Sequence, residues 1–83
     1  MEIIPTLKHF LSTEITAATR NIQEIDPDED LLAEGIIDSM ILLKLVSFIE
    51  ETFSVKVLDE DVTHENFRSF KSIEAFIEQK QKS

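Results

Sequence analysis

Hydrophobic residues recur at helical spacing along most of the chain, and strand-like alternation is limited to residues 54–57. The first stretch predicts a helix from about Ile3 to about Ala18, in which Pro5 is tolerated because it falls in the first turn. One face of this helix carries the apolar residues Ile3, Leu7, Phe10, Leu11 and Ile15. We expect that face to be buried.

The clearest helix signal begins at Asp38, because an aspartate is a favoured N-cap for the residues that follow it. After it, apolar residues recur at helical spacing at Leu42, Leu45, Val46, Ile49 and Phe53. The other side carries the polar residues Lys44, Ser47, Glu50 and Glu51. The pattern predicts an amphipathic second helix that begins after Asp38 and ends at Phe53.

Two further helical segments are predicted in the last third of the chain. A brief one lies around Asp59 to Asn66, and a longer one is capped by Ser69. The longer segment directs four apolar residues inward and ends in a lysine-rich stretch that suits a helix C-terminus. Its inward residues are Phe70, Ile73, Phe76 and Ile77.

A long polar connection from about Arg20 to Asp38 separates the first two helices. Residues 24–38 contain seven acidic residues and no basic one, but four aliphatic residues in this stretch indicate that it folds back onto the core. These are Leu31, Leu32, Ile36 and Ile37. The expected fold is therefore all-α: a small four-helix bundle of three main helices and one short helix, with a long first loop.

The length and the net charge of the chain argue against several classes of function. The 83 residues suffice for one domain, 1–83, and are too few to enclose a deep active site. Eight basic against seventeen acidic residues give a net charge of −9, which argues against nucleic acid or an anionic membrane as partner. Such a charge steers partners with basic surfaces, or it only keeps the protein soluble. We expect a monomer.

The chain lacks cysteine, so it has no disulfide framework and no thiolate chemistry of its own. No stretch approaches the roughly 18 apolar residues of a membrane helix, so we expect no membrane insertion. The N-terminal residues lack the basic start and apolar core of a signal peptide. A cytoplasmic location fits these features.

Residues suited to catalysis or metal binding are sparse. There is no glycine-rich phosphate loop and no nucleophilic triad signature, and neither His9 nor His64 has a neighbour at metal-ligand spacing. We interpret each histidine as a lone surface residue and expect no catalytic residue, no metal site and no enzymatic activity.

An acidic run resembles the start of an EF-hand calcium loop. Asp26, Asp28 and Asp30 match its first three ligand positions. The position that needs glycine is Leu31, and the position of the bidentate glutamate is Ile37. A solvated acidic loop therefore fits better than a calcium site.

The segment Gly35–Met40 places a serine at the start of the second helix. Gly35 permits a turn, Asp38 caps the helix, and Ser39 falls in the first turn with its hydroxyl exposed. A phosphate ester on that hydroxyl would lie beside free backbone N–H groups and the positive end of the helix dipole. Taken alone, however, Asp38-Ser39 is better interpreted as an ordinary helix cap, because capping residues begin most helices.

The wider pattern resembles the acyl carrier protein family over nearly the whole chain. Gly35-x-x-Asp38-Ser39-Met40 opening an apolar helix is similar to the family's attachment motif. The acidic stretch 30–32 before it and the acidic residues 59–61 after the second helix are similar to the family's layout. The last-helix region, residues 65–77, resembles that of stand-alone carriers.

This resemblance implies that Ser39, with Asp38 beside it, holds a 4′-phosphopantetheine arm, which makes the protein a phosphoprotein. A phosphopantetheinyl transferase would attach the arm from coenzyme A, and the thiol of the arm would carry an acyl or aminoacyl group as a thioester. The implied partners are that transferase, a loading ligase, and a downstream synthase or transferase. An acidic helical interaction module without an arm is the alternative.

The sequence departs from the carriers of bulk fatty acid biosynthesis, which usually read Leu-Gly-Ala-Asp-Ser-Leu and have acidic residues early in the second helix. Here the matching early positions are Ile41 and Lys44, while later acids remain. The pattern is closer to D-alanyl, aminoacyl or specialised polyketide carriers. The resemblance implies a partner-binding face made of Met40, Ile41, Lys44, Glu50 and Glu51.

The second helix carries more apolar residues than one buried stripe needs. We hypothesise that a gap between the helices accepts part of a medium-length acyl chain, and a filled core with exposed cargo is the alternative. The residues that would line such a gap are Val46, Ile49, Val62, Phe67 and Phe70.

Overall fold

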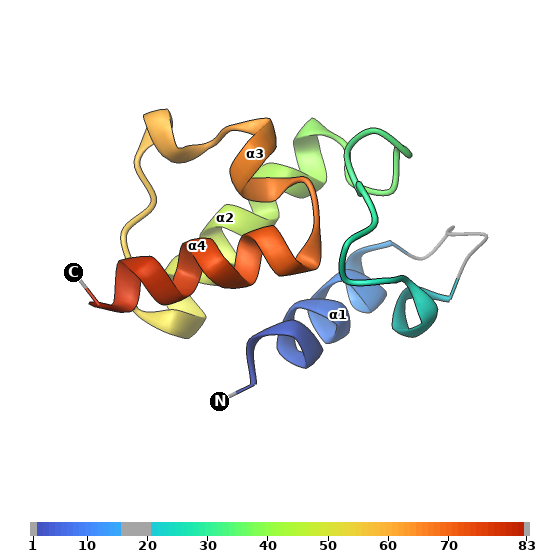
Figure 1. Ribbon diagram of the computed structural model, residues 1–83, viewed down its shortest axis with the longest axis horizontal. Helices are drawn as coiled ribbons and strands as arrows, with labels where there is room; N and C mark the ends of the chain where they lie inside the picture. Colours follow the sequence, from blue (N-terminus) through green and yellow to red (C-terminus); the bar gives the residue numbers. More distant parts are fainter. Residues whose placement is uncertain (1, 16–20, 83) are drawn as a thin grey trace.

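The long acidic connection joins two helices that pack against a third. The structure, a computed structural model, describes residues 2–15 and 21–82. Within these ranges it contains four α-helices, two short 3₁₀ helices and no β-strand (Figure 1). In chain order they are α1 (Ile3–Glu14), η1 (Ile22–Glu24), α2 (Ser39–Phe53), η2 (Asp59–Asp61), α3 (His64–Phe67) and α4 (Phe70–Lys82). The expected all-α fold is confirmed.

Helix α2 has the predicted bounds and cap. The Asp38 carboxylate accepts a hydrogen bond from the backbone N–H of Ile41 at 2.8 Å, which satisfies one of the N–H groups that a helix start leaves unpaired. The helix ends where Ser54 adopts a left-handed conformation with φ 55°. A polar residue in this conformation ends the helix without a glycine.

Helix α1 ends at Glu14, before the predicted limit at Ala18. Ile15 has already left the helical conformation, with φ −106° and ψ 81°, although its N–H still donates to the carbonyl of Leu11 at 2.8 Å. The remainder of the predicted helix, including Ala18, and the start of the predicted connection at Arg20 lie outside the described residues.

The predicted third segment is divided into η2 and α3. The break occurs because Thr63 is extended and acts as the N-cap of α3, where its hydroxyl accepts a hydrogen bond from the N–H of Asn66 at 3.2 Å. Ser69 then caps α4 as predicted, accepting from the N–H of Ser72 at 3.1 Å. The Thr63 cap therefore separates η2 from α3, and the Ser69 cap begins α4 directly after α3.

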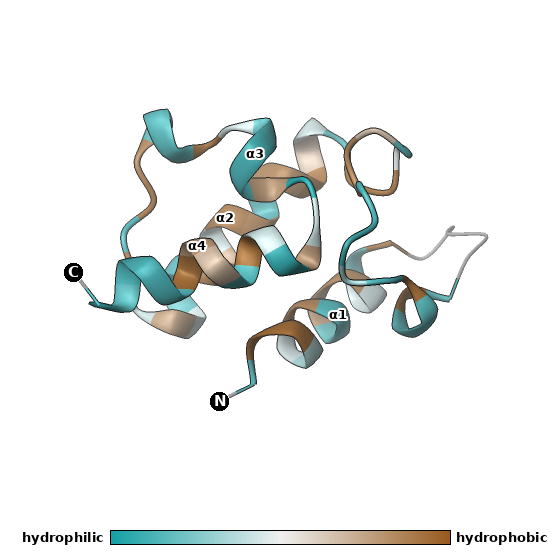
Figure 2. Cartoon of the chain, in the orientation of Figure 1, coloured by the Kyte–Doolittle hydropathy of each residue, from teal (hydrophilic) through white to brown (hydrophobic). Residues whose placement is uncertain are grey.

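The core lies where α1 and α2 pack against α4 and where α3 covers the start of α4. Phe10 of α1 stacks on Phe48 of α2 with ring centroids 4.3 Å apart. Phe67 and Phe76 form a second ring contact at 5.4 Å between α3 and α4. In Figure 2 the ribbon of α4 changes between brown and teal along its length, as expected for a helix with one buried face. The four inward residues predicted for α4 are all buried.

Candidate functional site

The acidic loop that leads to Ser39 is fixed to the corner between α3 and α4. The carbonyl of Pro27 accepts a hydrogen bond from the N–H of Lys71 at 3.0 Å, and the N–H of Leu31 donates to the carbonyl of Arg68. The side chain of Leu31 is fully buried. The prediction that this loop folds back onto the core is confirmed.

A compact turn then sets the start of α2. The carbonyl of Leu31 accepts hydrogen bonds from the N–H groups of both Ile36 and Ile37, at 2.9 and 3.2 Å. Gly35 makes this turn possible because its φ is +73°, a conformation that other residues adopt only with strain. Ile37 is buried, so the chain is anchored immediately before Asp38.

Ser39 is the first residue of α2 and is exposed to solvent. Its hydroxyl has no hydrogen-bond partner among the residues that the structure describes. The carboxylate of Asp38 occupies the N–H of Ile41, and the N–H groups of Ser39 and Met40 lack helical partners because they lie in the first turn. The donors and the helix dipole at this end suit a phosphodiester on the Ser39 oxygen.

Three other serines offer poorer positions for a large attached group. Ser69 is buried and its hydroxyl caps α4, and the hydroxyl of Ser12 donates to the carbonyl of His9 at 2.6 Å. Ser47 is exposed, but it lies within α2, where backbone N–H groups are already paired. Ser39 alone among these combines exposure with a helix start.

Two of the three aspartates that resemble an EF-hand, Asp26 and Asp30, stabilise turns of the loop. Asp26 accepts from the N–H of Asp28 at 2.9 Å, and Asp30 accepts from the N–H of Ala33 at 2.9 Å. Asp28 lies 4.0 Å from Lys71. Within residues 2–15 and 21–82, no group of three or more acidic or histidine side chains could hold a metal ion.

His64 is not a lone surface histidine, contrary to the sequence-based interpretation. Its Nε2 lies 2.8 Å from Oδ2 of Asp30, so the first residue of α3 contacts the loop before Ser39. The hydrogen bond from Ala33 and the contact with His64 lower the pKa of the Asp30 carboxyl below its ordinary value. The two residues are 34 positions apart, and no local pattern brings them together.

The exposed surface beside Ser39 is apolar. The side chains of Met40 and Leu43 are 66% and 67% exposed, whereas Ile41 is half-buried. Leu43 was not among the residues predicted for the partner face. It lies one helical turn after Ser39 and outside the buried stripe of α2, and that position in the sequence was the signal for its exposure.

The charged residues predicted for the partner face differ in their surroundings. Lys44 is exposed but its ammonium lies 3.4 Å from the carboxylate of Glu14 on α1. Glu50 is half-buried and accepts a hydrogen bond from the N–H of Val57 at 2.9 Å, which holds the chain after α2. Glu51 is exposed.

The hypothesised gap for an acyl chain coincides with packed core. Ile49, Phe67 and Phe70 are fully buried, and Val46 and Val62 are half-buried.

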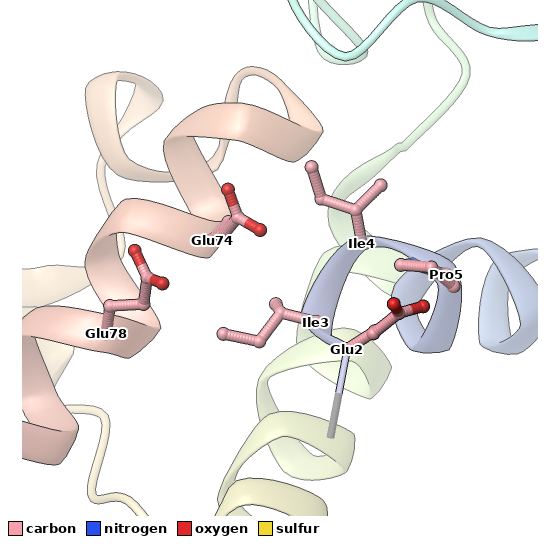
Figure 3. A pocket seen from close by; sticks show the side chains of 6 residues that line it. All are labelled: Glu2, Ile3, Ile4, Pro5, Glu74 and Glu78. Atoms are coloured by element: carbon pink, nitrogen blue, oxygen red, sulfur yellow. The ribbon is translucent and has the colours of Figure 1, made fainter.

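An open cavity of about 400 Å³ lies elsewhere, between the first turn of α1 and α4 (Figure 3). Its lining residues are Glu2, Ile3, Ile4, Pro5, Glu74 and Glu78, none of which belongs to α2 or to the loop before it.

Comparison with known proteins agrees with this geometry. The sequence profile of the family described as "phosphopantetheine attachment site" matches residues 11–77, which include the loop, α2 and most of α4. The chain therefore belongs to this family, whose domains carry covalently bound 4′-phosphopantetheine. A search of curated proteins finds no match. None of the helices in the described ranges is long and apolar enough to cross a membrane.

Proposed function

We propose that this protein is an acyl carrier protein that bears its arm on Ser39. The observation that carries the proposal is the exposed hydroxyl of Ser39 on the first residue of a capped helix, within the segment that matches the family. The bound arm supplies a terminal thiol that holds acyl or aminoacyl cargo as a thioester. The chain itself contributes no thiol, because it has no cysteine.

The proposed attachment is a phosphoryl transfer from coenzyme A. The Ser39 oxygen forms a bond to the β-phosphorus of coenzyme A as the pyrophosphate linkage breaks, which releases adenosine 3′,5′-bisphosphate and the hydroxyl proton. A separate phosphopantetheinyl transferase with magnesium supplies the catalysis. Asp38 holds the helix start, and the first-turn N–H groups and dipole favour the phosphodiester product.

We further propose that the protein serves a specialised pathway in the cytoplasm and not bulk fatty acid synthesis. The apolar side chains of Met40 and Leu43 lie next to Ser39, and the early part of α2 has no acidic residue. Partners would be a loading ligase and a downstream synthase or transferase. The face they contact consists of Met40, Ile41, Leu43, Lys44 and Glu51, together with the half-buried Glu50, which also accepts the N–H of Val57.

Intact-mass measurement tests the attachment. Incubation of the unmodified protein with coenzyme A, magnesium and a broad-specificity phosphopantetheinyl transferase is expected to add one 4′-phosphopantetheine group. The Ser39→Ala variant is expected to remain unmodified with the same helical content by circular dichroism. Ser47→Ala is the matched control, because it removes another exposed hydroxyl from the same helix.

An unmodified wild type across several transferases would instead favour the interaction module without an arm. Modification of the Ser39→Ala variant would show that a different residue is the acceptor.

A further inference from the structure

Several contacts join the loop before Ser39 to α3 and to the start of α4. Two are backbone hydrogen bonds, from Leu31 to Arg68 and from Lys71 to Pro27. A third is the side-chain contact between Asp30 and His64, at 2.8 Å. A further side-chain contact, between Asp28 and Lys71, is longer at 4.0 Å, and both of its side chains are at least 70% exposed. Substitution of His64 removes the shorter of the two.

Asp30 is placed to act on the turn that follows it. One carboxylate oxygen accepts the N–H of Ala33, while the other contacts His64. The next residue, Leu31, provides the carbonyl that binds the N–H groups of Ile36 and Ile37. His64 is therefore linked to the start of α2 through Asp30, the turn and the buried Ile37.

We propose that His64 and Asp30 form a positioning pair that fixes the Ser39-bearing loop against α3. This inference rests on the proposed function, because it concerns how Ser39 is presented to the transferase. The pair touches no reacting atom. Its effect is to raise the fraction of molecules in which the loop and the start of α2 are held in the arrangement that the enzyme binds.

We expect loss of the pair to weaken binding of the carrier to the transferase and to leave the rate of phosphoryl transfer unchanged. If only a fraction of the carrier molecules is competent, the apparent affinity of the enzyme for the carrier falls by that fraction. The His64 side chain is 59% exposed and the Asp30 side chain 26%, and such exposed pairs stabilise their contacts only modestly. We therefore expect loss of the pair to raise the KM of the transferase for the carrier about two- to five-fold, with unchanged kcat.

The test compares the unmodified wild type with His64→Ala and His64→Gln. Steady-state modification gives kcat and KM for the carrier, and amide hydrogen exchange at Ile36 and Ile37 reports the loop before any modification. His64→Ala is expected to raise KM and to speed exchange at both amides. His64→Gln is expected to restore both values toward wild type, because its amide N–H can donate to Asp30.

Two control variants distinguish a specific effect of the His64–Asp30 pair from a general loss of stability. His9→Ala removes the other histidine, which is exposed on α1. Lys80→Ala removes an ion pair of the same 2.8 Å length, to Asp61, that joins η2 to α4. Neither control is expected to change KM or the exchange of Ile36 and Ile37.

The proposal is overturned if His64→Ala matches wild type in KM and in exchange, or if Lys80→Ala raises KM equally. Failure of the proposed function has a different signature, namely an unmodified wild type. In that case the exchange rates of His64→Ala and His64→Gln still decide whether the pair holds the loop.

Discussion

The ammonium group of Lys44 on α2 lies 3.4 Å from the carboxylate of Glu14 at the end of α1. Lys44 is the only basic residue of α2, and no acid occupies the neighbouring positions 40, 41, 47 and 48 of the same helix. Its charge is nevertheless balanced, because the packing of α1 on α2 brings Glu14 to it. Lys44 therefore has both a structural contact and an exposed position on the proposed partner face.

The first prediction concerns partner choice. The Ile41→Asp/Lys44→Glu double variant makes the early part of α2 acidic, which favours enzymes with basic docking surfaces. We expect it to be used better by enzymes of bulk fatty acid synthesis and loaded less well by the native ligase. The measurement is kcat/KM of both enzymes with wild type and the double variant. Equal values for both carriers would remove the main support for a specialised pathway.

Exchanging the charges of Glu14 and Lys44 distinguishes an effect of the substitution on enzyme docking from an effect on the stability of the carrier. Lys44→Glu alone places two carboxylates together, and we expect it to lower the free energy of unfolding by about 1 kcal/mol or less, because the pair is exposed. Adding Glu14→Lys restores opposite charges with their positions exchanged. If the ligase defect of Lys44→Glu disappears on adding Glu14→Lys, the defect came from the fold and not from the partner face.

The second prediction concerns charge repulsion. The net charge of −9 is concentrated in residues 24–38 and 59–65. The carboxylates of these segments therefore repel one another in the folded state. We expect moderate salt or millimolar magnesium to raise the melting temperature through screening and weak binding. Differential scanning fluorimetry at increasing ionic strength measures this. A melting temperature independent of both salt and magnesium would contradict the prediction.

The third prediction concerns the location of the cargo. Ile49, Phe67 and Phe70 are fully buried, so an acyl chain can enter the bundle only by displacing packed side chains. Each methylene buried would contribute about 0.8 kcal/mol, and losing the packing of one core side chain costs about 2–5 kcal/mol, so several buried methylenes would be needed only to balance the displacement of one side chain. For wild type we expect acylation to change NMR shifts only near Ser39. Changes extending to Phe67 and Phe70 would show that the chain enters the bundle.

A variant with a cavity in the core tests whether added space allows the acyl chain to enter the bundle. Ile49→Ala removes a buried side chain, which costs about 2–5 kcal/mol and leaves space beside α2. If the variant remains folded, acylation is expected to shift Phe67 and Phe70 and to recover part of the lost stability. Ile49→Val is the control with a smaller cavity, and it also serves if the alanine variant unfolds.

The fourth prediction concerns acid sensitivity. The contact with Lys80 at 2.8 Å and the N–H of Leu58 lower the pKa of the Asp61 carboxyl below its ordinary value of 3.8. The stability from this carboxylate is therefore fully present above about pH 3.8 and is lost as the pH falls through the lowered folded-state pKa. Asp61→Asn is expected to melt below wild type at neutral pH, and the difference should vanish in strong acid.

A second substitution identifies the source of that difference. In a Lys80→Ala background, the effect of Asp61→Asn at neutral pH is expected to shrink, because the ion pair is already absent. Thermal melts of the four proteins across the acidic range provide the comparison. An undiminished effect would assign the stability to the hydrogen bond from Leu58 instead of Lys80.

Features that depend on neighbouring residues could be predicted from the sequence. The caps at Asp38 and Ser69 and the apolar stripe of α2 are of this kind, since each is set within a few residues. The division between η2 and α3 has a local cause too, because Thr63 is a favoured N-cap three residues before Asn66. The predicted single segment over residues 59–66 does not include this cap.

Contacts between distant segments could not be predicted. Asp30 meets His64 and Glu14 meets Lys44 only because helix packing brings segments 30 or more positions apart together. From the local sequence alone, each of these side chains would be placed at the surface without a specific partner. The hydrogen bond from Val57 to Glu50 likewise depends on the path of the chain after α2, which the weak pattern of residues 54–57 does not specify.

The cap at Asp38 has a consequence for the order of events on the proposed pathway. Because the Asp38 carboxylate already satisfies the N–H of Ile41, the first turn of α2 is formed without a phosphate, and the N–H groups of Ser39 and Met40 remain without helical partners. The acceptor is preorganised, so attaching the arm requires no coil-to-helix transition. The unmodified and modified proteins would then have the same backbone conformation. A partner enzyme could distinguish them only through contacts with the arm itself.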